Sequence, residues 1–341
     1  MARYPSHPSS GRRGRIRRHV YTISALLIIA ISYCIYRIAI RDTHPGPKVT
    51  PEASTDINPP LLPMVPRSEA ELEVNLSEII PEPTPEPNPE AAKLITEAMA
   101  LLDAKPAKII DARDRLNETL PMPMSHHQRA FVKKQLSGLA EKWLFSRTVL
   151  PKDTLCGFYK VEAGDQLRTI GKQYKVPYEI LAQINNISHP KGLQAGEMIK
   201  VINGPFHARI YCSTFTMDLY LQNTFVRSFP VGLARVGHAT PTGLWRVKFG
   251  GKLIKPTWTD PDTGKTYEAE DPDYPLGSRW IGLEGVKGDA VGRTGFAIHG
   301  TKEPEQIGTT GSRGCIRLHN GDAILVYNLL VPLYSRVEIV E

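Results

Sequence analysis

The sequence has little cysteine, with only four in 341 residues. So few cysteines exclude a small secreted scaffold held together by disulfides, because such folds combine many cysteines with a much shorter chain. A chain of this length is expected to form two or three domains.

Residues 1–41 contain no lysine, aspartate or glutamate, but they contain eight arginines. The formal net charge of the chain is +7, whereas residues 42–341 carry 34 basic and 35 acidic side chains. The net positive charge is therefore confined to one end of the chain. This distribution excludes the nucleic-acid binding that a broadly basic surface would indicate.

The arginines flank an apolar run at residues 20–36, which Arg37 separates from three further apolar residues. About 20 residues are needed to cross a bilayer, and Arg37 can reach the membrane interface. We therefore expect a transmembrane signal-anchor at 20–40, with a basic tail at 1–19 in the cytoplasm and the rest exported. The alternative, a cleaved signal peptide, is disfavoured because bulky residues follow the run.

A proline-rich linker is expected at 41–89, since residues 43–90 contain twelve prolines. Such a chain favours extended polyproline II and can act as a spacer. Residues 90–149 instead have apolar residues at helical spacing, in three stretches separated by turns near 105–106 and 121–123. This helical segment is predicted to pack within the protein or to bind a protein partner.

Residues 156–203 predict a small α+β module with the order strand, helix, helix, strand. Gly164 and Asp165 form the first turn, where Asp165 is expected to cap a helix, and Asn185 is expected to hydrogen-bond backbone in a turn. The module resembles the LysM family, which implies binding to N-acetylglucosamine polymers such as peptidoglycan. The matching residues are Tyr159, Val161, Gly164, Asp165, Leu167, Ile170, Tyr174, Leu181, Asn185 and 193–196.

Residues 205–341 predict a mainly-β domain, with three strands in its first 30 residues and a long loop at 251–277. A histidine, His299, precedes Cys315 by sixteen residues. A cysteine nucleophile needs a base within reach and surroundings that favour the thiolate. His299 can supply the base, and the nearby Arg313 and Arg317 are expected to lower the pKa of the thiol. Gly314 leaves room for an oxyanion hole of backbone N–H groups.

The strings TPTG, RWIGL, AIHGT and SRGCIRL occur in that order in this domain. The domain therefore resembles the catalytic domain of the L,D-transpeptidases, the YkuD family, over about residues 206–341. The resemblance implies Cys315 as nucleophile and His299 as general base, oriented by the carbonyl of Gly300. It also implies that Ser312, Arg313 and Gly314 shape the thiolate and oxyanion pocket, and that Arg317 binds a substrate carboxylate. Many members of the family have a histidine where this chain has Arg313. Arginine cannot act as a base at physiological pH, so a proton-transfer role of that histidine cannot apply here.

The remaining cysteines fit an exported protein. Cys34 lies in the apolar run, and Cys156 and Cys212 flank the LysM-like module. We expect a disulfide between Cys156 and Cys212, with two buried free thiols as the alternative. No metal or organic cofactor is implied.

Together these features predict a multidomain bacterial protein: an N-terminal transmembrane helix, a helical segment, a LysM-like module and a mainly-β catalytic domain. The family resemblance implies a cysteine-dependent acyltransferase that forms 3→3 cross-links between peptidoglycan stems through a thioester, exposed to the periplasm or cell wall. Its partners would be peptidoglycan and the membrane. The alternatives are an L,D-carboxypeptidase using the same residues, or an inactive wall-binding protein.

Overall fold

The computed structural model describes residues 86–341 except Val236. The predicted tail, the anchor and most of the proline-rich linker lie outside the described residues. Within the part that is described, no helix combines the length and apolar character that a membrane span requires.

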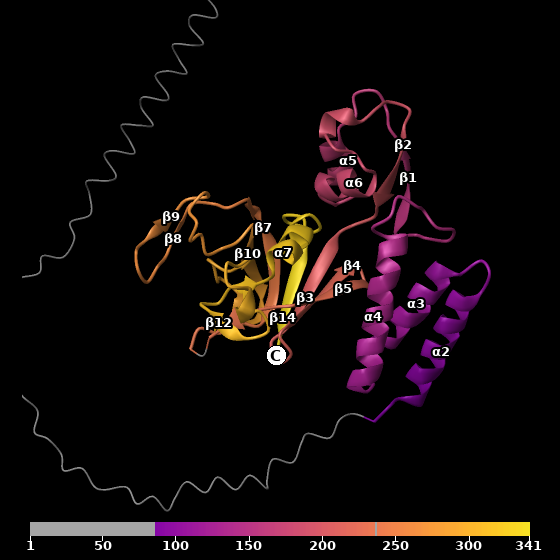
Figure 1. The fold of residues 1–341 in the computed structure, drawn as a ribbon, viewed down its shortest axis with the longest axis horizontal. Helices are drawn as coiled ribbons and strands as arrows, with labels where there is room; N and C mark the ends of the chain where they lie inside the picture. The colour runs from indigo at the N-terminus through magenta and orange to yellow at the C-terminus, as the bar shows by residue number, and fades with distance from the viewer. Residues whose placement is uncertain (1–85, 236) are drawn as a thin grey trace, which may run out of the picture. The chain divides into compact units, whose positions relative to one another are not determined.

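Three helices open the described chain, as the apolar spacing predicted (Figure 1). They are α2 (Pro89–Asp103), α3 (Ile109–Thr119) and α4 (His126–Trp143). The side chain of Asn88 caps α2 by accepting from the N–H groups of Glu90 and Ala91. Ser125 and Gln128 form a capping box at the start of α4. Side-chain caps of this kind satisfy N–H groups that lack partners within a helix, and so they fix where these helices begin.

The LysM-like module has the predicted order, from β1 through two short helices to β2. Its elements are β1 (Cys156–Lys160), α5 (Leu167–Gln173), α6 (Tyr178–Ile184) and β2 (Met198–Ile202). β1 and β2 pair antiparallel, with Cys156 opposite Ile202. Leu167, Ile170 and Ile180 are buried between helices and strands and form the centre of the module.

The remaining chain forms an eight-stranded sheet in the order β13-β11-β10-β7-β14-β3-β4-β5. The three strands predicted at its start are present. The strands of the sheet are β3 (Phe206–Tyr211), β4 (Thr216–Leu221), β5 (Thr224–Pro230), β7 (Gly243–Leu253), β10 (Trp280–Lys287), β11 (Ala297–His299), β13 (Ile316–Arg317) and β14 (Arg336–Val340). Two minor pairs lie outside it: β6 (Leu233–Ala234) with β12 (Thr310–Ser312), and β8 (Trp258–Thr259) with β9 (Thr266–Tyr267).

One detail differs from the sequence-based expectation. The segment 251–277 is not a plain loop, because it contains the β8–β9 hairpin (Figure 1). Its two strands are short, and short elements lack enough alternations to give a clear periodic signal. The last helix of the domain is α7 (Asn320–Tyr327).

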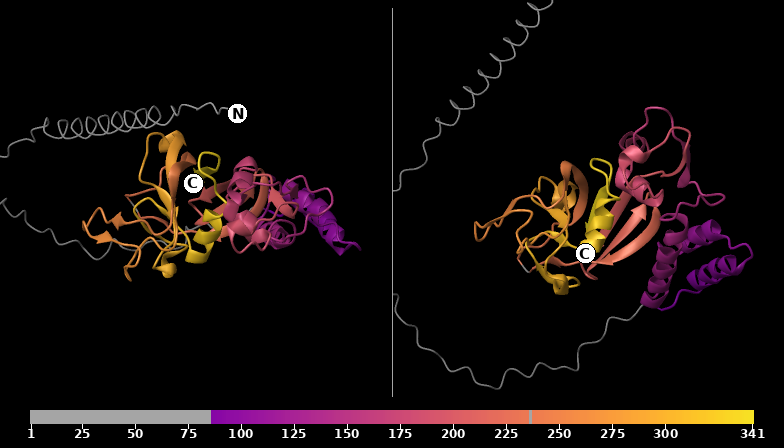
Figure 2. Two further views of the ribbon diagram at one scale, coloured as in Figure 1. Left: turned by 90° about the horizontal axis from the view of Figure 1, so that it is seen from above. Right: turned by 45° about the horizontal axis from the view of Figure 1, so that its top comes forward.

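The helical segment packs on the sheet through α4 and β5, which are labelled beside each other in Figure 1. Figure 2 shows the same purple and magenta helices from two further directions. Lys133 of α4 forms an ion pair of 2.6 Å with the fully buried Asp218 of β4. Asn117 of α3 accepts from the backbone N–H of Phe225 at 3.0 Å. These contacts support the packing role of the segment, and a protein partner for it stays a prediction.

Candidate active site

Strand pairing brings His299 and Cys315 to the same place. His299 ends β11, and Cys315 immediately precedes β13. These two strands are parallel neighbours in which Ile298 lies opposite Ile316 and His299 opposite Arg317. The fifteen intervening residues make the crossover that a parallel pair requires, which explains the wide spacing in the sequence.

His299 is buried, with only 6% of its surface exposed. Its Nδ1 lies 2.6 Å from the carbonyl oxygen of Gly300. A carbonyl can only accept, so Nδ1 carries the proton and Nε2 is left with a lone pair. Burial lowers the pKa of His299 to about 4, with a further lowering by the charge of Arg317, while carbonyl groups of Gly300 and Leu276 act in the opposite direction. The ring is therefore a neutral base at physiological pH.

The thiol of Cys315 is also in its neutral form. Burial raises its pKa to about 11, although a backbone hydrogen bond from Ala297 and the charge of Arg317 both act to lower it. The sulfur lies 3.8 Å from the carbonyl oxygen of Gly295. The charge of Arg317 lowers the pKa of the thiol, as expected, but the effect of burial is larger.

The turn at 312–315 is fixed by hydrogen bonds of its own residues and one from outside. Ser312 Oγ donates to the carbonyl of Cys315 at 2.6 Å and accepts from the N–H of Gly314 at 3.3 Å. Thr240, from the TPTG string, donates its hydroxyl to the carbonyl of Gly314 at 2.8 Å. Gly314 has φ +117°, and a Cβ there would lie 2.6 Å from the ring of Phe296. Only glycine fits this position.

Arg317 is a buried cation with donors to spare. Its side chain is bonded to Gln306, and the residue is 7% exposed. Among the described residues, nothing accepts from its Nε or Nη2. A buried donor without an acceptor is costly, and a guanidinium fork matches a carboxylate.

The guanidinium of Arg313, a residue expected to shape the thiolate pocket, forms ion pairs with the β8–β9 hairpin. Its Nη1 lies 2.6 Å from Asp260 and its Nη2 lies 2.5 Å from Asp262. The ion pair with Arg313 is the main reason that the pKa of Asp260 is lowered to about 2.

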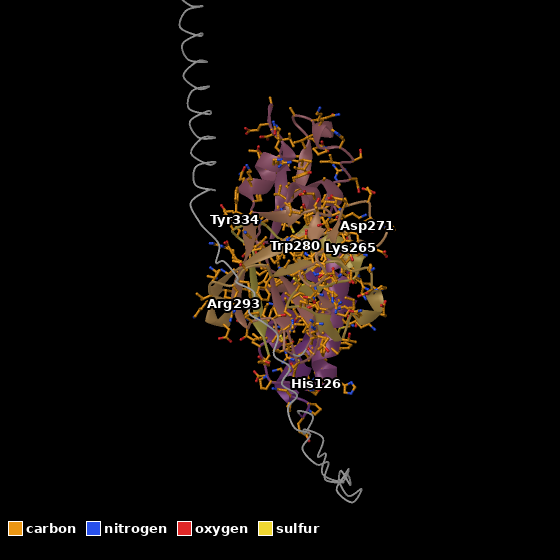
Figure 3. All side chains as sticks on the ribbon, turned by 90° about the vertical axis from the view of Figure 1, so that its left-hand side faces the viewer. His126, Lys265, Asp271, Trp280, Arg293 and Tyr334 are labelled. Atoms are coloured by element: carbon orange, nitrogen blue, oxygen red, sulfur yellow. The ribbon has the colours of Figure 1, made fainter. Side chains whose placement is uncertain are left out.

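A cavity of about 510 Å³ joins these groups. His299, Cys315 and Arg317 line it on the sheet side, and Trp258 and Tyr267 line it from the hairpin. The cavity is also lined by Arg235, Asp260, Leu276, Trp280, Thr301, Ser312 and Arg313. Figure 3 views the molecule from the hairpin's side, with Trp280 and Lys265 labelled. Gly300 acts on this site through its carbonyl, which hydrogen-bonds Nδ1 of His299.

Sequence reasoning missed two residues that hold the His299 ring and its loop. Trp280 stacks on the His299 ring with centroids 5.6 Å apart and an angle of 14°. Asn320 accepts from the N–H of Ser278 at 2.9 Å and donates to the carbonyl of Thr301 at 2.8 Å. Trp280 stands in the RWIGL string, so that string already pointed toward it, but no local pattern pointed to Asn320.

The LysM-like module has a groove of about 330 Å³ between the loops that follow β1 and precede β2. Its lining residues are Asp165, Gln166, Leu167, Arg168, Tyr178, Pro190, Lys191 and Leu193. Asp165 is not the helix cap that we expected, because the N-cap residue of α5 is Gln166. Asp165 instead accepts from the hydroxyl of Tyr159 and the N–H of Glu162, both at 2.8 Å, and so closes the turn that contains Gly164, where φ is +93°.

Asn185 is buried and hydrogen-bonds backbone, as predicted. Its amide donates to the carbonyls of Leu181 and Lys200 at 2.9 and 2.8 Å, and its oxygen accepts from the N–H of Lys200 at 2.7 Å. It therefore joins α6 to β2, and its role is structural within the module.

The predicted disulfide between Cys156 and Cys212 is wrong, because both cysteines are free in the structure. Cys156 starts β1 opposite Ile202, where the module meets the sheet domain. Cys212 follows β3, which begins at Phe206 and leads away from that junction (Figure 1). Six residues of extended strand span about 20 Å, whereas a disulfide needs Cα atoms within about 7 Å of each other.

Comparisons with known proteins give the same two domains. The family model of the L,D-transpeptidase catalytic domain, YkuD, matches residues 206–339, and the model of the LysM domain matches residues 159–201. The chain is 29% identical over 188 residues to a Bacillus subtilis protein named L,D-transpeptidase YkuD, covering 53% of this chain and 97% of that relative. It is 32% identical over 130 residues to a second protein of that organism, named L,D-transpeptidase YqjB, covering 38% of this chain and 67% of the relative.

Among solved structures, L,D-transpeptidase 3 from Mycobacterium tuberculosis is similar at a TM-score of 0.32 and 18% identity, covering 43% of this chain and 66% of that one. So low a score supports no conclusion, and the assignment rests on the sequence matches. The chain belongs to the L,D-transpeptidase (YkuD) family and also contains a LysM domain.

Proposed function

We propose that this protein is a peptidoglycan L,D-transpeptidase in which Cys315 is the nucleophile and His299 the general base. The single observation that carries the proposal is the neutral His299, whose Nδ1 is bonded to the Gly300 carbonyl at 2.6 Å, in the same cavity as Cys315. This bond leaves Nε2 free to accept the thiol proton. The membership in the family supports the reaction class.

The acyl-donor step starts from a neutral thiol and a neutral imidazole. As the sulfur bonds to the carbonyl carbon of the third stem residue, the thiol proton passes to His299 Nε2, and the carbonyl electrons move to its oxygen. Peptide N–H groups of the turn 312–315 stabilise that oxygen. The intermediate collapses with loss of D-alanine, whose amine takes the proton from His299, and a thioester remains on Cys315.

The second step resolves the thioester. An amine of the diamino acid in a neighbouring stem attacks the thioester carbon and gives its proton to His299. The Cys315 sulfur leaves and regains that proton, and the product is a 3→3 cross-link. If water attacks instead, the same residues make the protein an L,D-carboxypeptidase.

Arg317 would bind a carboxylate of the donor stem. It lies in the same cavity as Cys315, is buried, and has two nitrogens, Nε and Nη2, without acceptors among the described residues. The LysM groove would hold the glycan strand and so raise the local concentration of stems near the cavity. Both domains imply peptidoglycan as the ligand.

Incubation of the purified protein with a carbapenem tests the nucleophile. The expected result is one adduct on Cys315, found by peptide mass spectrometry, and no adduct in Cys315→Ala. Product analysis on tetrapeptide muropeptides then separates the two outcomes, because a 3→3 dimer indicates a transferase and a tripeptide monomer a carboxypeptidase. A wild-type protein that gave neither adduct nor product would contradict the proposal and favour an inactive wall-binding protein.

We also propose that residues 20–40 anchor the chain in the cytoplasmic membrane with the catalytic domain outside. The arginines before the apolar run support this orientation. A reporter enzyme fused after residue 60 should be active if it is of the kind that works only outside the cytoplasm. Activity of a reporter that works only in the cytoplasm would contradict this topology.

A further inference from the structure

The β8–β9 hairpin forms one wall of the cavity, yet no strand of the large sheet pairs with it. Trp258 and Tyr267 are opposite each other in the hairpin, and their rings stack with centroids 6.0 Å apart. Both line the cavity. Because β8 and β9 pair only with each other, something other than sheet hydrogen bonds must hold this wall in place.

Most polar contacts of the inserted segment are internal to it. Tyr274 donates its hydroxyl to the carbonyl of Pro256 at 2.6 Å, and Thr257 donates to Glu268 at 2.6 Å. Contacts of this type shape the segment without fixing it to the sheet domain.

The strongest contact that leaves the hairpin is made by Arg313. It pairs with Asp260 at 2.6 Å and with Asp262 at 2.5 Å, at the turn that joins β8 to β9. The other cations from outside the segment lie farther away, since Lys302 is 3.4 Å from Asp273 and Arg235 is 3.9 Å from Asp262.

Asp260 is also the residue that closes the hairpin. Its N–H donates to the carbonyl of Lys265 at 2.9 Å, and its own carbonyl accepts from the N–H of Gly264 at 2.8 Å. Its side chain is only 16% exposed, which weakens solvent screening of the pair with Arg313. One carboxylate therefore connects the backbone of the hairpin turn to the turn that carries Cys315.

We propose that Arg313 is a positioning residue that holds the β8–β9 hairpin against the nucleophile's turn, so that Trp258 and Tyr267 form the wall on which the acyl donor binds. Arg313 acts on the reaction through the hairpin and not on the sulfur. The proposal rests on the proposed function for its kinetic consequence, but the attachment of the hairpin is a separate and measurable property.

The test compares Arg313→Gln, Asp260→Asn and the double variant with the wild type. The structural readout is cleavage after Lys265, which is exposed in the hairpin, by a protease specific for lysine, with the fragment identified by mass. This protease ignores arginine, so the variants have the same cleavage sites. Arg293→Gln is the matched control, because Arg293 is exposed and does not line the cavity (Figure 3).

Arg313→Gln removes the pairs with Asp260 and Asp262 and should speed cleavage after Lys265 at least about tenfold. Asp260→Asn leaves the pair with Asp262 and should have a smaller effect, and the double variant should do no more than Arg313→Gln. The KM for the tetrapeptide donor should rise by about the same factor, with kcat much less affected. Added salt should reproduce part of the effect in the wild type, because the pair of Arg313 with Asp262 is ionic and partly exposed.

Two results would overturn the proposal. One is unchanged cleavage after Lys265 in Arg313→Gln. The other is a fall in kcat at saturating donor with KM and cleavage unchanged, since Arg313 would then act on the reacting atoms. If the wild type proved inactive, the proposed function would fail, but the cleavage measurements would still decide whether Arg313 holds the hairpin.

Discussion

At the scale of single residues, His299 and Cys315 lie in surroundings that favour their uncharged forms. Burial lowers the pKa of His299 to about 4 and raises that of Cys315 to about 11. With these values an imidazolium–thiolate pair is strongly disfavoured in the resting protein. The thiol is then activated only when a donor is in place, which limits side reactions of a free thiolate.

The first prediction concerns pH. Alkylation of Cys315 by iodoacetamide should be slow at neutral pH and should rise as the pH approaches about 11, because only the thiolate reacts. Acyl transfer should fall as the pH drops through about 4, where His299 gains a proton and can no longer act as a base. Peptide mass spectrometry distinguishes Cys315 from the other cysteines. A plateau of fast alkylation between pH 5 and pH 8 would indicate a preformed thiolate instead.

The second prediction concerns Gly314. Gly314→Ala should lower the rate of Cys315 acylation by about 100-fold, because a shift of about 1 Å at a catalytic turn has effects of that size. The added Cβ would meet Phe296 at 2.6 Å, and the ring of Phe296 packs against Trp245 with centroids 5.0 Å apart. The turn must therefore move.

Gly292→Ala is the matched control, since Gly292 also has a positive φ (+73°) but has open space where a Cβ would lie. It should lose a little stability from backbone strain and keep the acylation rate. Equal acylation by the wild type and Gly314→Ala would show that the turn tolerates the side chain.

At the scale of elements, α4 and β2 are joined by a lysine that the sequence did not single out. Lys200 of β2 is fully buried, and its ammonium donates to the carbonyls of Trp143, Ser146 and Thr148 at 2.5, 2.9 and 2.8 Å. Carbonyls at the end of a helix have no partner within the helix. Lys200 of the LysM domain donates hydrogen bonds to such carbonyls, so the LysM domain and the helical segment stabilise each other.

The third prediction follows from this contact. Lys200→Met should lower the free energy of unfolding by about 2–3 kcal/mol, because it leaves buried carbonyls without a donor. Thermal unfolding of the two proteins measures the difference. Lys160→Met is the control, since Lys160 is an exposed lysine of the same two-stranded sheet. Equal destabilisation by both substitutions would argue against a special role for Lys200.

At the scale of the whole molecule, the LysM domain is not a separate unit on a flexible tether. Its core is continuous with those of the helical segment and the catalytic domain. Deletion of residues 158–203 would remove Lys200 together with the groove, so it would mix loss of binding with loss of folding. Single substitutions on the surface of the groove separate the two effects.

The fourth prediction uses such a substitution. Arg168 lines the groove and lies over the ring of Tyr178, 5.2 Å from its centroid. Arg168→Glu should weaken binding to isolated sacculi in a pull-down several-fold, because it reverses a charge in a shallow polar site. The rate of Cys315 acylation by a soluble carbapenem should stay at the wild-type value. Loss of both sacculus binding and Cys315 acylation would indicate a disturbed fold.

Local pattern and motif spacing were enough to predict several elements and the family from the amino-acid sequence. Alternating apolar residues gave the strands β3 to β5, helical spacing gave α2 to α4, and the ordered strings around His299 and Cys315 gave the family. These features are encoded by neighbouring residues or by short motifs, so a linear reading can find them.

Features that join distant residues became visible only in the folded chain. The protonation of Cys315 depends on the balance between burial and the charge of Arg317, and that balance has no local signal. Arg313 reaches Asp260 across 53 residues and Lys200 reaches Trp143 across 57. Cys156 and Cys212 are free because β3 carries Cys212 away from the LysM domain (Figure 1). Such contacts arise from packing, where geometry in space and not order along the chain sets which groups meet.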